Sequence, residues 1–484
     1  MKVKVIDKKD NVGVVLEHRQ PIPYGHKVAL KDIAAGDLVI KYGSPIGEAT
    51  VDISKGDWVH SHNLDTMLNS AMEWNDGSVA PFLPSLPDAD LDDSTFFYGY
   101  RRSDGQVGIR NELWIIPTVG CVCKLAEHIA ERIREKVHEN SAIDGVLCLS
   151  HPYGCSRLEE DIKRTERVLK SLCQHPNAGG VLLLGLGCEH NQVEQILDEI
   201  EDRSRIRGLV CQECVDEEQE AMRLIEELIE QATTFKREAV SVSELNIGVK
   251  CGGSDGLSGI TANPLVGRVV DNLISHGGSA IMAEIPEMFG AEHVLLRRCA
   301  SEEVFDQANL MIESMKQYYR NQGVPISENP SPGNKDGGIT TLEEKSLGCV
   351  QKGGSSPITG VTGYGERIST CGLNIVETPG NDLVSATAIA AAGAQIMLFT
   401  TGRGTPMGSI VPTIKISSNT ELYEKKKGTW IDFDAGRCLD DIDLGTYDRE
   451  LWEMILDVAS GKQKTCSEKH ARQEFAVFQT GVVL

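Results

Sequence analysis

The chain has no long apolar run and no excess of basic residues, and both absences limit what it can do. None of its hydrophobic stretches is long enough to span a bilayer. Its first residues, Met-Lys-Val-Lys-Val-Ile-Asp, alternate like a strand and lack the apolar core of a signal peptide. A formal net charge of -23 argues against binding to nucleic acid or to an anionic membrane surface. We therefore expect a cytoplasmic protein with neither kind of partner.

Several common ligand-binding motifs are also missing. The glycine-rich segment that starts at Cys251 lacks the Gly-Lys-Ser/Thr ending of a P-loop and does not match G-x-G-x-x-G, so we expect no nucleotide. Cys121-Val-Cys123 and Cys211-Gln-Glu-Cys214 have no second matching pair downstream, so neither qualifies as a structural zinc site. Fourteen cysteines without a secretory signal indicate a reducing compartment, where they stay thiols or bind metal.

Length and patterning predict a multidomain α/β protein. At 484 residues the chain is too long for one ordinary core. Short alternating runs broken by glycine predict a small β-rich module over residues 1–70, and residues 71–95 have linker composition. Strand-like runs alternate with charged helical segments over 96–235 and again over 236–484, which predicts two α/β domains with parallel sheets. The second contains a proline- and glycine-rich stretch, 326–345, that we expect to be a long functional loop.

Four glycine-flanked segments each bring a cysteine to the predicted end of a strand. In open α/β sheets, ligands bind outside the carboxyl ends of the strands. Cysteine also packs as a small buried residue, but fourfold repetition favours a metal-dependent active site over packing. The segments are Thr118-Val-Gly-Cys121, His151-Pro-Tyr-Gly-Cys155, Gly185-Leu-Gly-Cys188-Glu189 and Lys250-Cys251-Gly-Gly-Ser-Asp255.

Other polar residues suit an anionic, polyhydroxylated ligand. His60 and His62 lie on one face of an extended strand and could converge on one cation or substrate, although solvated histidines explain them equally well. Arg110 could hold a carboxylate bidentately, with an ordinary salt bridge as the alternative. Further candidates on glycine-rich or proline-rich hinges are Asn263, Asn334, Lys345, Arg403 and Thr405.

Taken together, these segments resemble the altronate and galactarate dehydratase family along the whole chain. The resemblance implies a small SAF-type β module followed by two α/β domains, and a divalent metal instead of an organic cofactor. It also implies a hydro-lyase of hexuronate (galacturonate) catabolism that converts D-altronate to 2-dehydro-3-deoxy-D-gluconate and water. The segments that carry it include Gly25-His-Lys-Val-Ala-Leu30, Val59-His-Ser-His-Asn63, Arg110-Asn-Glu-Leu-Trp-Ile115, Pro286-Glu-Met-Phe-Gly-Ala-Glu292, Glu328-Asn-Pro-Ser-Pro-Gly-Asn-Lys335 and Trp430-Ile-Asp-Phe-Asp-Ala-Gly436.

The implied reaction assigns roles to the candidate residues. Removing the C2 proton beside a carboxylate creates a dianion that a divalent cation stabilises, while a base takes the proton and an acid protonates the departing C3 hydroxyl. For metal binding we predict His60, Cys155, Cys188, Glu189 and Cys251. For proton transfer we predict His62, His151, Asp255 and Lys345, the last of which could instead hold the carboxylate. For substrate binding we predict Arg110, Asn263, Asn334, Arg403 and Thr405.

The residues leave some alternatives open. Thiolates suit ferrous iron or an iron-sulfur cluster, whereas imidazole and carboxylate suit mononuclear iron or manganese, and the resemblance favours mononuclear Fe2+ with Mn2+ as the alternative. Galactarate dehydration and a sulfo-lyase reaction on sulfolactate fit the same fold. A sugar-acid-binding protein without catalysis is a more distant alternative. The small-molecule acid is the one partner that we expect, and homo-oligomerisation stays open.

Overall fold

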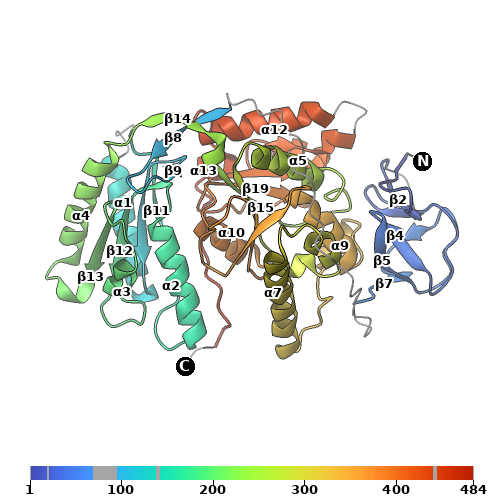
Figure 1. Ribbon diagram of the computed structural model, residues 1–484, viewed down its shortest axis with the longest axis horizontal. Helices are drawn as coiled ribbons and strands as arrows, with labels where there is room; N and C mark the ends of the chain where they lie inside the picture. The colour runs from blue at the N-terminus through green and yellow to red at the C-terminus, as the bar shows by residue number, and fades with distance from the viewer. Residues whose placement is uncertain (1, 19–20, 69–94, 138–141, 440–443, 483–484) are drawn as a thin grey trace.

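The computed structural model describes residues 2–18, 21–68, 95–137, 142–439 and 444–482. Figure 1 shows a small β module at one end of the molecule, an α/β unit at the other end and a larger α/β unit between them. The predicted fold class is thereby confirmed. The predicted linker, 71–95, lies outside the described residues except for residue 95. No helix in the described ranges has the length and apolar character needed to cross a bilayer.

The N-terminal module consists of two small antiparallel sheets. Their apolar side chains, among them Val12, Val39 and Ile46, are buried in a core that continues into the central unit. One sheet has the order β1-β2-β3-β6, with β1 Val3–Lys4, β2 Val12–Val15, β3 Lys27–Ala29 and β6 Trp58–Val59. The other has the order β4-β5-β7, with β4 Leu38–Lys41, β5 Ser44–Ala49 and β7 Leu64–Asp65.

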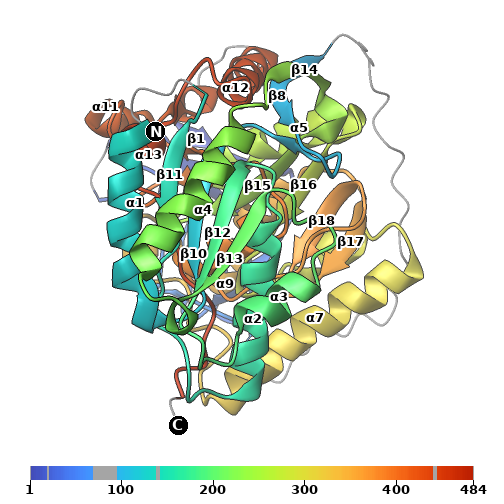
Figure 2. The same cartoon turned by 90° about the vertical axis from the view of Figure 1, so that its left-hand side faces the viewer.

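The second unit contains a four-stranded parallel sheet of order β11-β10-β12-β13. Its strands are β10 Glu112–Pro117, β11 Gly145–Cys148, β12 Ala178–Gly185 and β13 Ile206–Val210, and its helices are α1 Cys123–Val137, α2 Glu159–Cys173, α3 Val193–Asp198 and α4 Glu217–Ala232. Helix α4 begins after Asp216, whose carboxylate caps it by accepting a hydrogen bond from the backbone N–H of Gln219. Figure 2 views this unit face on.

A three-stranded antiparallel sheet joins the second unit to the third, in the order β14-β8-β9, with β8 Phe96–Arg101, β9 Val107–Gly108 and β14 Arg237–Ser241. The third unit contains a seven-stranded parallel sheet of order β17-β18-β16-β15-β19-β20-β21. Its strands are β15 Asn246–Cys251, β16 Ser279–Met282, β17 Ile358–Thr362, β18 Gly372–Val376, β19 Ile396–Thr401, β20 Thr413–Ser417 and β21 Phe433–Asp434.

The helices of the third unit lie on both faces of its sheet (Figure 1). Helix α10 packs against α2 of the second unit, so the two sheets are separated by a shared apolar layer. The helices are α5 Ala262–Ser275, α6 Glu292–Leu296, α7 Glu302–Asn321, α8 Pro332–Asp336, α9 Leu342–Cys349, α10 Asp382–Ala391, α11 Thr420–Lys426, α12 Leu444–Ala459 and α13 Cys466–Lys469. The stretch 326–345 is therefore not a simple loop, because it contains α8 and the start of α9.

Each parallel sheet has one position where neighbouring strands continue in opposite directions. In the third unit, β15 and β19 are neighbours; the chain continues from β15 to β16 on one side of this pair and from β19 to β20 on the other side. In the second unit, β10 and β12 are neighbours, and the chain continues from β10 to β11 on one side and from β12 to β13 on the other. The loops diverge at such a position and leave a crevice at the carboxyl ends of the strands, where ligands of open α/β sheets bind. The fold therefore offers two candidate ligand-binding edges.

The contact between the second and third units contains a buried histidine, which should make the folded protein less stable in acid. His175 is fully buried, its Nε2 lies 3.0 Å from the Ala394 carbonyl oxygen, and burial lowers its pKa to about 3. The unfolded chain takes up this proton near pH 6.5, so unfolding becomes easier as pH falls from about 6.5 to 3, by up to a few kcal/mol. We expect urea unfolding midpoints to fall over this range and H175Q, which cannot titrate, to show a shallower fall. Equal pH dependence in both proteins would contradict the assignment.

Candidate active site

The loops after β15 and β19 are tied together at the edge of the third sheet. Backbone N–H groups of Gly402 and Arg403 both donate to the Gly253 carbonyl oxygen, each over 2.9 Å. A Cβ atom at Gly402 would lie only 2.2 Å from Cγ of Asp255, so the close approach of these loops requires glycine there. This packing brings Asp255 and Arg403, two of the predicted site residues, to one cavity.

That cavity has a volume of about 410 Å³ and lies between the N-terminal module and the third unit. His18 and Tyr24 line it from the module, and Asp255, Arg403 and Lys425 line it from the third unit. The side chains of Arg403 and Lys425 are exposed, and neither forms an ion pair with any residue in the described parts of the chain. Asp255, Asp336 and Glu421 line the same cavity, so its charge is mixed, but the two unpaired cations suit the anionic group of a small ligand.

The Asp255 side chain is fixed by several hydrogen-bond donors. Its Oδ1 accepts hydrogen bonds from the hydroxyls of Ser258 and Ser418, over 2.8 and 2.7 Å, and from the backbone N–H groups of Leu257 and Ser258. Its Oδ2 accepts one from Asn419 over 3.0 Å. The unequal use of the two oxygens leaves Oδ2 with capacity to accept a further proton.

A buried charge cluster joins the N-terminal module to α9 beside this cavity. Lys27 and Lys41 reach across the interface and donate to the two carboxylate oxygens of Glu344 over 2.7 and 2.8 Å. All three side chains are at most 1% exposed. One carboxylate thus faces two ammonium groups, and the cluster carries an excess of positive charge.

The pKa values of this cluster follow from burial and pairing. Burial lowers the pKa of Lys27 to about 8, against the attraction of Glu344. Burial also opposes the charged forms of Lys41 and Glu344, but their mutual attraction prevails, so the pKa of Lys41 rises and that of Glu344 falls. One carboxylate fully compensates only one ammonium, so Lys27 is the first group of the cluster to lose its proton.

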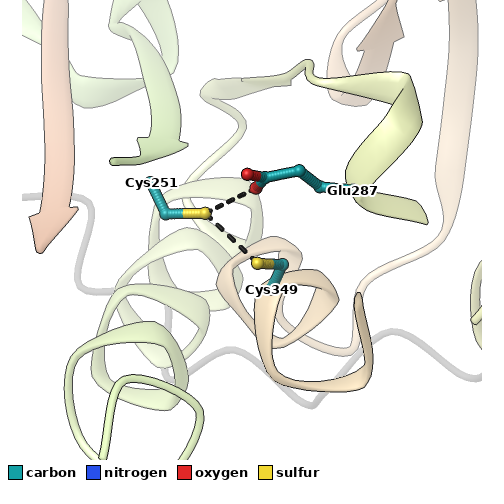
Figure 3. Close-up of side chains that lie close together, drawn as sticks. All are labelled: Cys251, Glu287 and Cys349. Atoms are coloured by element: carbon teal, nitrogen blue, oxygen red, sulfur yellow. Dashed lines mark hydrogen bonds between the residues drawn. The ribbon is translucent and has the colours of Figure 1, made fainter. Parts of the chain in front are cut away.

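A second buried cluster lies at the end of β15. Figure 3 shows Cys251, Glu287 and Cys349 converging from β15, the 3-10 turn Ile285–Met288 and the end of α9. The Cys251 sulfur lies 2.8 Å from Glu287 Oε2 and 3.3 Å from the Cys349 sulfur. Each residue offers one ligand atom, and these three atoms lie within 4.8 Å of one another. Two thiolates and a carboxylate suit a soft divalent ion such as Fe2+.

Lysines surround this group of ligands and set its charge. Lys352 Nζ lies 3.3 Å from the Cys251 sulfur, and Lys345 Nζ lies 2.8 Å from Glu287 Oε1. These lysines lower the pKa of Glu287 to about 2 against the effect of burial, whereas contact with Cys349 and burial raise the pKa of Cys251. When both thiols are protonated, the three carboxylates and the three ammonium groups around them have a net charge of zero. Replacing the two thiol protons by one divalent ion leaves this net charge unchanged. The charged groups are Lys250, Lys345, Lys352, Glu284, Glu287 and Asp382.

A small inner cavity lies between the two regions. It has room for about one water molecule, and its walls include Tyr42, Asp255, Asn263, Lys345 and Cys349. Asp255 therefore borders both the inner cavity and the larger one. The candidate metal ligands and the candidate substrate cavity are thus neighbours at one edge of the sheet.

The structure places several of the predicted site residues away from this edge. Cys155 and Cys188 lie at the carboxyl edge of the second sheet, as do His151 and Glu189. His151 is buried with Nε2 3.0 Å from the Pro117 carbonyl oxygen, and burial lowers its pKa to about 4. Glu189 accepts hydrogen bonds from Thr118 and from the backbone of Leu186 and Gly187. Both side chains are thus committed to shaping loops.

The predicted histidines of the N-terminal module lie at its contact with α8. His60 Nε2 lies 2.9 Å from the Lys335 carbonyl oxygen, so this nitrogen is already used, while the exposed His62 packs its ring against Trp58. Neither residue lines the cavities described above.

Four predicted binding residues make internal contacts. The Arg110 guanidinium is buried and pairs with Glu468 over 2.7 Å. Asn263 bonds to Thr400 and Gly348, and Asn334 to Ser254 and Ser331. Thr405 accepts from the backbone of Met407 and holds Lys415 through its carbonyl group. Of these four, only Asn263 borders a cavity.

Comparison with known proteins gives the family. Three family models match residues 1–67 (altronate/galactarate dehydratase SAF domain), 99–233 (D-galactarate dehydratase/altronate hydrolase, second domain) and 242–483 (D-galactarate/altronate dehydratase, C-terminal). Altronate dehydratase of Bacillus subtilis (strain 168) is 48% identical over 475 residues, which cover 98% of this chain and 94% of that protein. The chain belongs to the altronate/galactarate dehydratase family.

Members of the family differ in their similarity to this chain. Altronate dehydratase of Escherichia coli (strain K12) is 47% identical over 98% of this chain and 94% of its own length. Galactarate dehydratase (L-threo-forming) of the same organism is 36% identical over 97% of this chain and 92% of its own length. The (2R)-sulfolactate sulfo-lyase subunit beta of Chromohalobacter salexigens is 32% identical over 79% of this chain and 96% of its own length.

Sequence reasoning missed the residues that join this family's SAF module to the third unit. Lys27 and Lys41 stand in β-rich segments, and Glu344 precedes the predicted Lys345, yet no periodicity distinguishes a buried lysine from a solvated one. Glu287, Cys349 and Lys352 were missed for a similar reason, because they lie in short turns and at a helix end. The Pro286–Glu292 segment was noted only as part of the family resemblance.

The buried charge cluster yields a stability prediction. In E344Q, Lys27 and Lys41 would face a neutral amide, and leaving buried charges unpaired costs about 3–5 kcal/mol. Glu343 supplies a matched control, since it is equally buried but accepts from Thr66 and the Met67 backbone without an ion pair. We expect the urea unfolding midpoint to fall further for E344Q than for E343Q. An equal fall of the urea unfolding midpoint in both variants would show that pairing the two lysines with Glu344 does not contribute to stability.

Proposed function

We propose that this protein is a hydro-lyase that converts D-altronate to 2-dehydro-3-deoxy-D-gluconate and water in the breakdown of hexuronates such as galacturonate. The observation that carries the proposal is similarity over nearly the whole chain to two altronate dehydratases, at 48% and 47% identity, against 36% to a galactarate dehydratase. The exposed cations of the 410 Å³ cavity support it, because a six-carbon acid would place its carboxylate there.

Within that cavity, Arg403 is the proposed anchor for the substrate carboxylate. Its guanidinium makes no internal ion pair among the described residues, and two parallel N–H donors suit a carboxylate. Lys425 adds a second positive charge at the same cavity. Together they offset the long-range repulsion that a chain of net charge -23 exerts on an acid.

Asp255 is the proposed base. Its carboxylate has a donor-rich Oδ1, which fixes the group, and a less used Oδ2, which is our candidate acceptor for the C2 proton. His18 lines the same cavity and is our candidate donor of a proton to the departing C3 hydroxyl. Water leaves, and the enol tautomerises to the 2-keto acid.

A divalent metal is part of the proposal, with Fe2+ preferred and Mn2+ as the alternative. Cys251, Glu287 and Cys349 would hold it, and their sulfur and oxygen donors with the charge balance described above fit such an ion. When bound, it would supply Lewis-acid stabilisation of negative charge. Lys345 and Lys352 hold the Glu287 carboxylate and the Cys251 sulfur in place. All fourteen cysteines are free thiols, which supports our proposal that the protein works in the cytoplasm.

Substrate specificity is tested by turnover. Metal-stripped protein would be assayed without oxygen on D-altronate, galactarate and sulfolactate, with and without Fe2+ or Mn2+, and 2-keto acid or sulfite would be measured. We expect a metal-dependent 2-keto-3-deoxy acid from altronate and little product from the other two. Preferential turnover of galactarate or sulfolactate would assign the chain to a sister activity. Binding of altronate without turnover, after verified metal loading, would indicate a sugar-acid-binding protein.

The two cavity residues should affect different kinetic constants. D255N removes the base and is expected to lower kcat by about 10²–10⁴-fold with little change in KM. R403Q removes a charged contact and is expected to raise KM by roughly 10–100-fold. R449A, at an exposed arginine on α12, serves as the control and should leave both constants unchanged. Unchanged kinetics in D255N would remove Asp255 from the mechanism.

A further inference from the structure

The carboxyl edge of the second sheet carries three cysteines that the proposed reaction does not use. Cys121 follows β10, Cys155 lies in the loop after β11, and Cys188 follows β12. All three are exposed, although cysteine is among the residues most often buried. Strand β10 lies between β11 and β12, so the three loops are neighbours. They meet where β10 and β12 lead in opposite directions, which is the ligand-binding position of an open α/β sheet.

Close backbone contacts hold these loops together. The backbone N–H of Gly120 donates to the Tyr153 carbonyl oxygen over 2.6 Å, and a Cβ atom at Gly154 would lie 2.5 Å from a methyl carbon of Val119. The Cys155 sulfur lies 3.9 Å from the carbonyl oxygen of Cys188. Ser156, next to Cys155, has a positive φ of 57°, an uncommon conformation for a residue other than glycine. The thiols are therefore presented by a fixed backbone.

Two buried polar groups near the cysteines have no partner. Arg157, two residues after Cys155, is only 7% exposed, and its Nη2 has no hydrogen-bond partner within the described ranges. Asn191, three residues after Cys188, is 4% exposed, and its Oδ1 is likewise without a partner there. Buried polar groups are rarely left unpaired. The unpaired Arg157 N–H belongs to a buried cation two residues from Cys155, and a positive charge there favours an anionic group at this edge. The Asn191 oxygen is an acceptor and needs a donor instead.

The spacing of the thiols argues against a single metal ion. Among the described residues, one group of three candidate ligand atoms lies within 4.8 Å of one another, and it belongs to Cys251, Glu287 and Cys349 in the third unit. The three exposed cysteines do not form such a set. An iron-sulfur cluster is larger than one ion and is held by cysteine thiolates. We propose that Cys121, Cys155 and Cys188 bind an iron-sulfur cluster, with one iron left without a protein thiolate.

The surroundings of Cys188 and Cys123 fit such a cluster. Gln212 Nε2 lies 3.7 Å from the Cys188 sulfur, and hydrogen bonds of this kind to cluster sulfurs tune its potential. Nearby Cys123 is buried, and its thiol donates to the His151 carbonyl oxygen over 3.1 Å, so this thiol is already used in an internal hydrogen bond. The Glu189 carboxylate already accepts three hydrogen bonds. In a cluster of four irons held by three cysteines, the fourth iron would be open to a small oxygen ligand from solution.

The test is reconstitution of the full chain with equal amounts of ferrous and ferric iron and with sulfide under anaerobic conditions. We expect about four iron and four acid-labile sulfide per chain, a visible charge-transfer absorption, and an electron paramagnetic resonance signal after reduction. C121S, C155S and C188S, made singly, should each lose most of the labile sulfide. C371S, at an exposed cysteine far from these loops in sequence, should keep all of it.

Circular dichroism and thermal unfolding of each variant would separate loss of the cluster from loss of the fold. Absence of labile sulfide in reconstituted wild-type protein, or its full retention in folded C155S and C188S, would overturn the proposal. The altronate reaction is judged independently, because it does not use these cysteines: turnover by folded C155S would leave the proposed function standing whatever its labile-sulfide content.

Discussion

The pairing of Lys27 and Lys41 with Glu344 is the interaction on which the candidate active site depends. It fixes a module of two small sheets, too small to bury much surface by itself, onto the third unit. Desolvating three charges is expensive, so the pairing holds only where the carboxylate oxygens meet both lysines closely. The result is a defined position for the module, which in turn places His18 and Tyr24 opposite Arg403. Without this contact the cavity would lose one wall.

The charges that line the cavity, and not the net charge of the chain, bear on how it could hold an acid. A net charge of -23 repels anions at long range, but screening confines that effect to roughly 10 Å at ordinary ionic strength. Inside the cleft, Asp255, Asp336 and Glu421 stand beside Arg403 and Lys425, so the two cations are local exceptions in a mixed lining. Neither cation forms an ion pair with a described residue, so both can meet the anionic group of a ligand. Overall charge therefore says little about this ligand, while the arrangement of a few lysines and arginines says much.

The fold class was predictable from the sequence, and so were the residues on one side of the candidate active site, for a physical reason. Strands end in glycine-rich loops, and those loops carry the ligand-binding residues, so Cys251, Asp255 and Arg403 could be found from position alone. Glu287 and Cys349 could not, because their role depends on a turn and a helix end that fold back onto β15. Buried lysines were equally hidden, since their sequence neighbours resemble those of solvated lysines.

The main difference concerns how the four cysteine segments combine. Sequence repetition favoured one assembled site, whereas the structure divides the segments between two sheets, with Cys251 buried at one edge and Cys121, Cys155 and Cys188 exposed at the other. Both edges follow the same topological rule, because each lies where neighbouring strands lead in opposite directions. What distinguishes them is the solvent exposure of the sulfur atoms and the charge around them. In the two proposals, the buried thiols among lysines would hold a compact cation in exchange for protons, whereas the exposed thiols would hold a larger anionic group.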